Sequence, residues 1–418
     1  MNIKWITWFC FLGPLGNLIP VLPNLAGFKF YFVVIGIGNL YNFIRWKENI
    51  RAITILTKIF PLIGYMFISS MIGYLTFGTI DFQGVGEGVF SYNPIFRVTL
   101  TFLLFSYVLF IGTGYYDLRK KYYFLMCFLA GYFVSLVAGY LILILFTFQI
   151  IDIEIIKKIE VLPQFAWGFL RFAPGSNANE YGIVTSYALT LSTLFIYYRK
   201  MKFINGYYKR IKGIYIIYFF MIGALFMTTT RAAYISYIIS IIYIILRRGN
   251  LMFKFKKICI FLLMSVVTMW MLSSSLEYLL DIDVLGILEG GYQAIGESNS
   301  TVGDRFQAWE DGYNEYLTTS VWFGIGAGRA YMLHNIYLQF YFELGAIGFS
   351  IFAIYVMLGI YKLYNWIKMC NNPLLIDVAI LGIVHVLWFG ASNHGLNQFL
   401  TWYVFFTLFL LKPCKTDN

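Results

Sequence analysis

The run Phe323-Gly-Ile-Gly-Ala-Gly-Arg-Ala-Tyr-Met-Leu-His-Asn335 joins a polar loop to a long apolar segment. It puts three glycines, an arginine and a histidine where a membrane helix would meet water. The apolar segment after it is one of many, because apolar runs of about 20 residues recur along all 418 residues. A helix needs about that length to cross a bilayer. The sequence therefore predicts a polytopic membrane protein.

The overall composition supports this prediction. The chain is 60% hydrophobic, 21% aromatic and only 12% charged, and its mean hydropathy is +0.72. We predict about 12 spanning helices, at residues 5–23, 27–43, 59–78, 98–115, 122–149, 183–198, 213–230, 232–246, 258–275, 335–361, 374–391 and 397–411. Since each must satisfy its own backbone hydrogen bonds in lipid, the predicted fold class is all-α, a single transmembrane domain over residues 1–418.

The basic residues orient the predicted spans. With the N-terminus in the cytoplasm, 23 of the 31 Lys and Arg residues fall on the cytoplasmic side and the other eight outside. About 16 of the 20 Asp and Glu residues fall outside. This asymmetry obeys the positive-inside rule and predicts that both termini are cytoplasmic. The net charge of +11 then reflects topology and contacts with membrane lipids, so it is not a sign of nucleic-acid binding.

The longest predicted loop, residues 276–334, lies outside, and loops of that size usually carry function. Within it Phe306, Trp309, Tyr313 and Tyr316 recur at steps of three and four residues. This spacing predicts an amphipathic helix around Asp304–Tyr316 with one aromatic face. We expect this helix to lie on the outer membrane surface and to roof a cavity.

Three histidines could carry acid–base chemistry. His334 stands at the predicted outer mouth of a span, where an imidazole can take a proton from a hydroxyl, although it could equally cap the helix start. His385 lies within a predicted span and is expected to be a buried imidazole with a hydrogen-bond partner. His394, in a short outer loop, could line the same cavity as His334.

Four arginines on the predicted outer side could bind an anion. Arg231 stands at a tight turn between two predicted spans, where a charge normally faces a cavity or a partner, unless it reaches out to the lipid headgroups. Arg171, Arg305 and Arg329 are the others. A guanidinium binds phosphate oxygens in a bidentate manner without a metal, so several around one pocket would suit a diphosphate.

Two short patterns point elsewhere and are weak. Asp281-Ile-Asp283 matches the DxD pattern of metal-using glycosyltransferases, but it lies on the wrong side for nucleotide sugars. The glycines at 324, 326 and 328 follow no strand and precede no lysine, so they are not a nucleotide loop. We expect them to permit a close backbone approach before a helix whose N-terminus could hold an anion. The five cysteines are scattered, so we predict no disulfide and no Cys-based metal site.

Four pieces of the C-terminal half resemble the signature region of the O-antigen polymerase and O-antigen ligase superfamily. They are Arg305-Phe-Gln-Ala-Trp309, Phe323-Gly-Ile-Gly326, His334-Asn-Ile-Tyr-Leu338 and Glu343-Leu-Gly-Ala-Ile-Gly348. Upstream, Gly175-Ser-Asn-Ala-Asn-Glu-Tyr-Gly182 is similar to an Asn-containing turn of that family. Thr230-Arg231-Ala232 is similar to its Ser-Arg-Gly turn, with Thr and Ala in place of the small neighbours. The first 150 residues resemble nothing beyond membrane spans.

The resemblance implies a metal-independent glycosyltransferase of the bacterial cytoplasmic membrane that works on its outer face. It implies that His334 is the general base, and that Arg231, Arg305 and Arg171 hold the diphosphate of an undecaprenyl-diphosphate-linked oligosaccharide. Asn335, which could orient either the imidazole or a sugar, Arg329 and Asn179 are the further expected substrate-binding residues, and the resemblance implies no cofactor. A chain-length regulator protein is a candidate partner.

The expected reaction is polymerisation of lipid-linked repeat units of O-antigen or capsule. The alternative within the family is the ligase, which passes finished polymer to lipid A-core, and the shared motifs do not separate the two. A flippase for the same glycan would need polar residues distributed through the spans, where Glu343 and Asp377 are the main charged residues. A non-catalytic scaffold would not explain Arg231 and His334.

Overall fold

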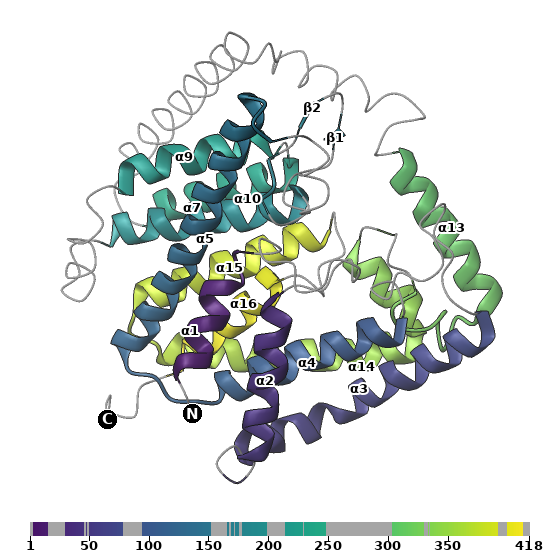
Figure 1. Ribbon diagram of the computed structural model, residues 1–418. Coiled ribbons are helices and arrows are strands. Elements are labelled where there is room, and N and C mark those ends of the chain that lie inside the picture. The colour runs from purple at the N-terminus through teal and green to yellow at the C-terminus, as the bar shows by residue number, and fades with distance from the viewer. Residues whose placement is uncertain are drawn as a thin grey trace. The chain divides into compact units, whose positions relative to one another are not determined.

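The computed structural model describes most of the predicted helices (Figure 1). It describes residues 3–15, 30–45, 47, 50–77, 94–151, 165–166, 169–170, 172–174, 178–198, 214–228, 230–247, 303–329, 333, 335–391 and 399–412. The predicted span 258–275 and most of the predicted outer loop therefore lie outside the described residues. The chain divides into two compact units: Met1–Pro14, Ile19–Phe128 and Arg305–Asn418 form unit 1, and Leu15–Leu18 and Leu129–Asp304 form unit 2.

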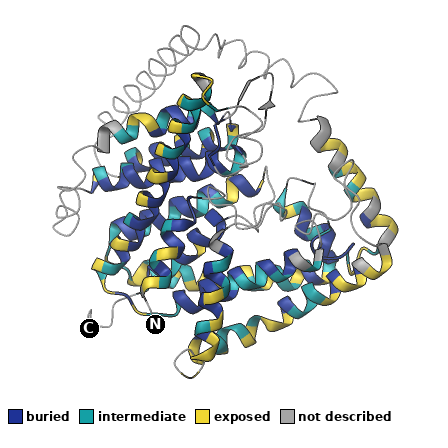
Figure 2. Cartoon of the chain, viewed as in Figure 1, coloured by how far each residue is buried: buried dark blue, intermediate teal, exposed yellow. Residues whose placement is uncertain are grey.

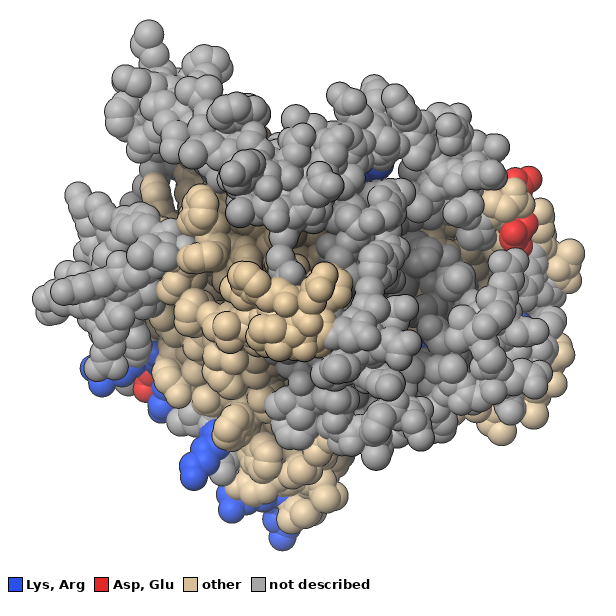
Figure 3. All heavy atoms as spheres, turned by 45° about the horizontal axis from the view of Figure 1, so that its top comes forward, with Lys and Arg blue, Asp and Glu red and all other residues tan. Residues whose placement is uncertain are grey.

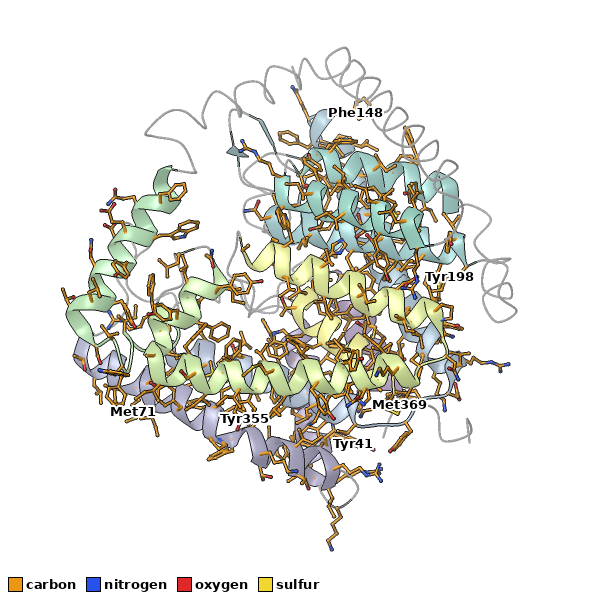
Figure 4. All side chains as sticks on the ribbon, turned by 180° about the vertical axis from the view of Figure 1, so that it is seen from behind. Tyr41, Met71, Phe148, Tyr198, Tyr355 and Met369 are labelled. Carbon is orange, nitrogen blue, oxygen red and sulfur yellow. The ribbon has the colours of Figure 1, made fainter. Side chains whose placement is uncertain are left out.

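Unit 1 is built from helices of both ends of the chain. Its helices are α1 (Ile3–Leu12), α2 (Phe30–Ile44), α3 (Ile50–Phe77), α4 (Pro94–Gly112), the first part of α5 (Leu118–Thr147), α13 (Gly303–Thr319), α14 (Ile336–Met369), α15 (Pro373–Gly390) and α16 (Phe399–Phe409). Helix α3 packs on both α4 and α14 (Figure 1). Tyr355 of α14 reaches α3, where its hydroxyl donates to the Lys58 carbonyl at 2.6 Å (Figure 4).

Unit 2 contains the rest of α5 with α7 (Ala178–Tyr197), α9 (Ile214–Met227) and α10 (Arg231–Arg247). Helix α7 is central, because it packs on both α9 and α10. One two-residue antiparallel ladder, β1 (Phe165–Ala166) with β2 (Phe169–Leu170), is the exception to the predicted all-α fold within the described residues.

The described helices have the length and composition of a membrane protein. Four of them are long and apolar enough to span a bilayer: Ile50–Gly73, Leu118–Phe146, Ile336–Met369 and Pro373–Gly390. Shorter apolar helices run through Phe32–Ile44, Arg97–Gly112, Ile217–Met227 and Phe399–Phe409. Figure 2 shows many exposed residues along the helices. Large apolar side chains are among them, since Leu75 and Tyr361 are 72% and 66% exposed. Lipid is the solvent that accommodates such a surface.

Two spans extend further than the sequence predicts. Helix α3 starts at Ile50 where the apolar run starts at 59, and α14 continues to Met369 where the run ends at 361. Both extensions carry basic residues, Arg51 and Lys58 on α3 and Lys362 and Lys368 on α14. A helix can continue past the hydrocarbon into the headgroup region, where Lys and Arg are favoured.

The predicted amphipathic helix is α13, which is slightly longer than the predicted segment. Only part of its aromatic face is covered. The Tyr316 side chain is buried and its hydroxyl donates to the Val321 carbonyl at 2.8 Å, and the indole nitrogen of Trp309 donates to the Leu333 carbonyl at 2.5 Å. Phe306 and Tyr313 remain exposed. The helix is thus tied by its aromatic residues to the segment that follows it.

Candidate functional site

Residues 320–329, here called the glycine loop, contain Gly324, Gly326 and Gly328. The predicted close backbone approach of these glycines is confirmed, and the loop lies against a break in helix α14. At Gly345 the backbone has φ 63° and ψ −175°, so the helix is interrupted about two and a half turns after its start. The loop runs antiparallel along this break. Ile325 N donates to Phe342 O at 2.9 Å, and Ala346 N donates to Val321 O at 2.9 Å. The loop thereby supplies partners for backbone groups that the broken helix cannot bond itself, as a membrane interior requires.

Glycine is required on both sides of this contact. Gly324 has φ +76°, and a Cβ there would lie 2.4 Å from the Glu343 carbonyl oxygen. At Gly345 a Cβ would lie 2.4 Å from Gly324 N. Positive φ and contact below 3 Å both exclude a side chain, so these positions are fixed by backbone geometry.

Helix α3 forms the other wall of the glycine loop. The Tyr65 hydroxyl donates to Leu344 O at 2.8 Å and lies 3.3 Å from Phe323 O, so this side chain contacts both the glycine loop and α14. Gly73 packs so closely that a Cβ would lie 2.7 Å from Ile325 O. No local pattern in the sequence distinguishes Tyr65 or Gly73 from other residues of a span, so the sequence does not identify either of them as a contact of the glycine loop.

Arg329, an expected substrate-binding residue, lies in this assembly. Its side chain is half-buried, and Nη1 donates to the Gly73 carbonyl at 3.0 Å. A guanidinium has five N–H donors in a rigid fork, so this bond fixes its direction without using all its donors. Arg329 is therefore a cation anchored at the end of the glycine loop.

Asn335, also expected to bind substrate, is the N-cap of α14. Its Oδ1 accepts hydrogen bonds from Tyr337 N at 3.0 Å and Leu338 N at 3.1 Å. Its Nδ2 donates to the Ala391 carbonyl at 3.2 Å, just beyond the end of α15. The amide thus satisfies the first N–H groups of the helix and fixes the backbone directly after His334.

A buried polar pair lies deeper in α14. Gln339 and Glu343 are only 6% and 2% exposed, and Gln339 Nε2 donates to Glu343 Oε1 at 2.9 Å. They are four residues apart on one helix face, a spacing that the sequence displays inside an apolar run. This is the signal that could have added Gln339 to the candidate residues. His385 is buried and its Nδ1 lies 2.8 Å from Leu381 O, which confirms the expected hydrogen-bonded imidazole.

In unit 2 the structure joins the two upstream motifs. The Thr230 hydroxyl donates to Ala178 O at 2.9 Å and lies 3.5 Å from Asn179 Oδ1. Gly182 makes room for it, since a Cβ there would lie 2.7 Å from the Thr230 Cβ. Thr230 lies in the turn between α9 and α10, so the predicted tight turn is confirmed. One buried hydroxyl thus makes a hydrogen bond between two segments about 50 residues apart in the chain.

Arg231 follows directly as the first residue of α10, and its side chain is exposed. Asn179 lies in the first turn of α7 and is half-buried. The geometry therefore places an arginine and an asparagine from the two motifs at neighbouring helix N-termini, where the backbone N–H groups also favour an anion. The sequence identifies Thr230 only as a replacement for the family's Ser, and its hydrogen bond to Ala178 O was not predicted.

The remaining predicted residues cannot be placed. His334, His394, Arg171, Asp281 and Asp283 lie outside the described residues, and Arg305 belongs to α13 without a described side chain. In the described part of the chain no three or more His, Cys, Asp or Glu side chains gather where they could hold a metal ion.

The comparisons with known proteins agree with the motifs. Residues 216–353 match a family model, Wzy_C, whose description is O-Antigen ligase. The matched range includes Thr230, Arg231, the glycine loop, Asn335 and the break at Gly345. No curated protein matches the chain.

Proposed function

We propose that this protein polymerises lipid-linked polysaccharide repeat units, starting from the match of residues 216–353 to the O-antigen ligase family model. The substrate is an oligosaccharide on undecaprenyl diphosphate, and the acceptor is a sugar hydroxyl at the outer face of the bacterial inner membrane. The observation that carries the proposal is the Thr230 hydrogen bond, because it joins the Asn179 turn to Arg231.

In the proposed reaction His334 acts as general base. It takes the proton of the acceptor hydroxyl while that oxygen attacks the anomeric carbon. The bond from this carbon to the phosphate oxygen breaks, and undecaprenyl diphosphate leaves with the bonding electrons. Negative charge grows on the departing diphosphate, so cations aimed at it stabilise the transition state more than the ground state.

The arginines supply those cations. Arg231 is assigned to the diphosphate together with Arg305 and Arg171, and Arg329 and Asn179 are assigned to substrate binding. Of the two roles expected for Asn335, orienting the imidazole or a sugar, we propose the first. Its Oδ1 is engaged by two backbone N–H groups, so we assign it to positioning the adjacent His334. Guanidinium serves diphosphate well because its fork matches two oxygens at once.

The experiment is complementation of a deletion strain, with the size of undecaprenyl-linked glycan as readout. The variants are His334→Ala and Arg231→Ala, each checked for membrane expression. Arg247→Ala is the matched control, because Arg247 is an exposed arginine at the other end of α10. Loss of one catalytic group typically costs about 10²–10⁴-fold in rate. We expect single repeat units to accumulate in both variants, and polymer to form with Arg247→Ala.

The same assay separates the alternatives. Long lipid-linked chains that never reach their final acceptor in the deletion strain would identify a ligase, in line with the description of the matching family. Glycan kept on the cytoplasmic face would identify a flippase, for which the break in α14 beside the buried Glu343 is the observation in favour. Full activity of His334→Ala or Arg231→Ala would remove that residue from the mechanism.

A further inference from the structure

A cluster of cations lies in unit 1 at the helix ends that carry the predicted cytoplasmic loops. Its centre is Lys412, three residues beyond α16. The Lys412 ammonium donates to the Gly112 carbonyl at 2.7 Å and lies over two aromatic rings, 5.4 Å from the centroid of Trp366 and 4.9 Å from that of Phe409. The charge is thus held in a fixed position at the edge of an apolar core.

Lys121 is tied to the same point. It is only 4% exposed, and its ammonium donates to the Lys412 carbonyl at 2.5 Å. A buried lysine charge is costly unless it is compensated. An ammonium has three N–H donors, and one carbonyl does not use them all. The arrangement can therefore accept an anion without rearranging its own hydrogen bonds.

Two exposed cations complete the cluster. Arg51 at the start of α3 donates from Nη1 to the Tyr115 hydroxyl at 2.7 Å, and Lys362 lies on the last turns of α14. Burial, together with the positive charges of Arg51, Lys121 and Lys362, lowers the pKa of Lys412 to about 8. The three charges that lower this pKa are all positive. Like charges repel each other, and an anion bound among these four cations would offset the repulsion.

The surroundings indicate that this anion belongs to a lipid. Three of the candidate spans have ends here: Ile50–Gly73 and Leu118–Phe146 begin near the cluster, and Ile336–Met369 ends near it. Tyr115, Tyr361 and Tyr364 are exposed at 49%, 66% and 54%, as tyrosines of a membrane interface are. Figure 3 shows several Lys and Arg side chains close together at its lower left, and Figure 4 labels Met369 at this end of α14.

We propose that Arg51, Lys121, Lys362 and Lys412 form a binding site for the phosphate headgroup of an anionic phospholipid. The acyl chains would lie against the exposed apolar side chains of α3 and α14, while the phosphate replaces water among the four cations. None of these four residues is among the proposed glycosyl-transfer residues, and by the predicted topology the site faces the cytoplasmic leaflet. It would fix the position of α16 and of the chain after it against α3, α5 and α14.

The test uses the purified full chain in detergent, titrated with phosphatidylglycerol, with phosphatidylcholine of the same acyl chains, and with inorganic phosphate. Lipid retained on the protein is counted by native mass spectrometry, and thermal unfolding is followed in parallel. Lys362→Gln and Lys412→Met are the variants. Lys368→Gln is the matched control, because Lys368 is also exposed on α14, lies over Tyr364 at 4.4 Å and is not among the charges that act on Lys412.

We expect phosphatidylglycerol to bind and to raise the unfolding midpoint, and phosphatidylcholine to do neither. Lys362→Gln should weaken the apparent affinity about fivefold, since one basic residue near a charged membrane surface contributes about that factor. Lys368→Gln should bind as the unaltered protein does. Equal binding of the two lipids, or unchanged binding by Lys362→Gln, would overturn the proposal even if Lys412→Met fails to fold. Stabilisation by inorganic phosphate that matches phosphatidylglycerol would overturn the lipid assignment.

Discussion

Replacing Gly345 by alanine should disrupt the contact between the glycine loop and α14. The residue has φ 63° with ψ −175°, a region that is almost reserved for glycine, and an L-residue held there costs about 1–3 kcal/mol. In addition, the new Cβ would lie 2.4 Å from Gly324 N and 2.6 Å from Trp322 O, both of them backbone atoms that cannot swing aside. Overpacking of this kind costs about 1–3 kcal/mol. The two costs together predict a loss of about 2–6 kcal/mol.

The same helix provides the control. Gly359 is exposed in the regular part of α14, and a Cβ there would meet nothing within 4 Å. Gly359→Ala should therefore be neutral or stabilise the helix by up to about 1 kcal/mol. Both variants are purified in one detergent, and thermal unfolding is followed by the fraction that remains monodisperse. If Gly345→Ala unfolds at the same temperature as Gly359→Ala, the break in α14 is not held by the loop as described.

Three further perturbations have defined outcomes. Thr230→Val, which keeps the shape but leaves the Ala178 carbonyl without its donor, should lower the free energy of unfolding by about 1–3 kcal/mol, and Thr230→Ser should recover most of it in a denaturation series. Because the pKa of Lys412 is lowered to about 8, the unfolded chain binds more protons from there up to about pH 10.4, so stability should rise with pH across that window. Lys412→Met should flatten that rise in thermal midpoints. Gln339→Leu removes a hydrogen-bond donor to the buried Glu343 carboxyl group and should lower the thermal midpoint, whereas an unchanged midpoint would show that this hydrogen bond contributes nothing to stability.

Much of the local structure could be predicted from the sequence. The tight turn before Arg231, the aromatic helix α13 and the close approach of the glycines all follow from short-range patterns of apolar, polar and glycine residues. These features depend on helix periodicity and on backbone sterics, which neighbouring residues determine. The N-cap role of Asn335 was not predicted, although an asparagine directly before an apolar run is a start signal for a helix.

The partners across the fold could not be predicted in this way. Tyr65 donates to a carbonyl 279 residues later in the chain, and nothing near Tyr65 marks it for that contact. The break in α14 at Gly345 could not be predicted either, since an isolated glycine in an apolar helix is usually tolerated without a kink. The predicted roles of His334, Arg171 and Arg305 stay predictions.

The contact between α3 and the broken α14 has a consequence for biosynthesis. Helix α3 enters the membrane while most of the chain is still unmade, yet the hydrogen-bond partners of Tyr65 and Ser69 lie at residues 323–344. Contacts of such long sequence separation form late, because a large loop must close first. Until the ribosome has produced α14, that face of α3 has only lipid or a chaperone to cover it. A nascent chain halted before residue 345 should therefore be a preferred target of membrane quality control.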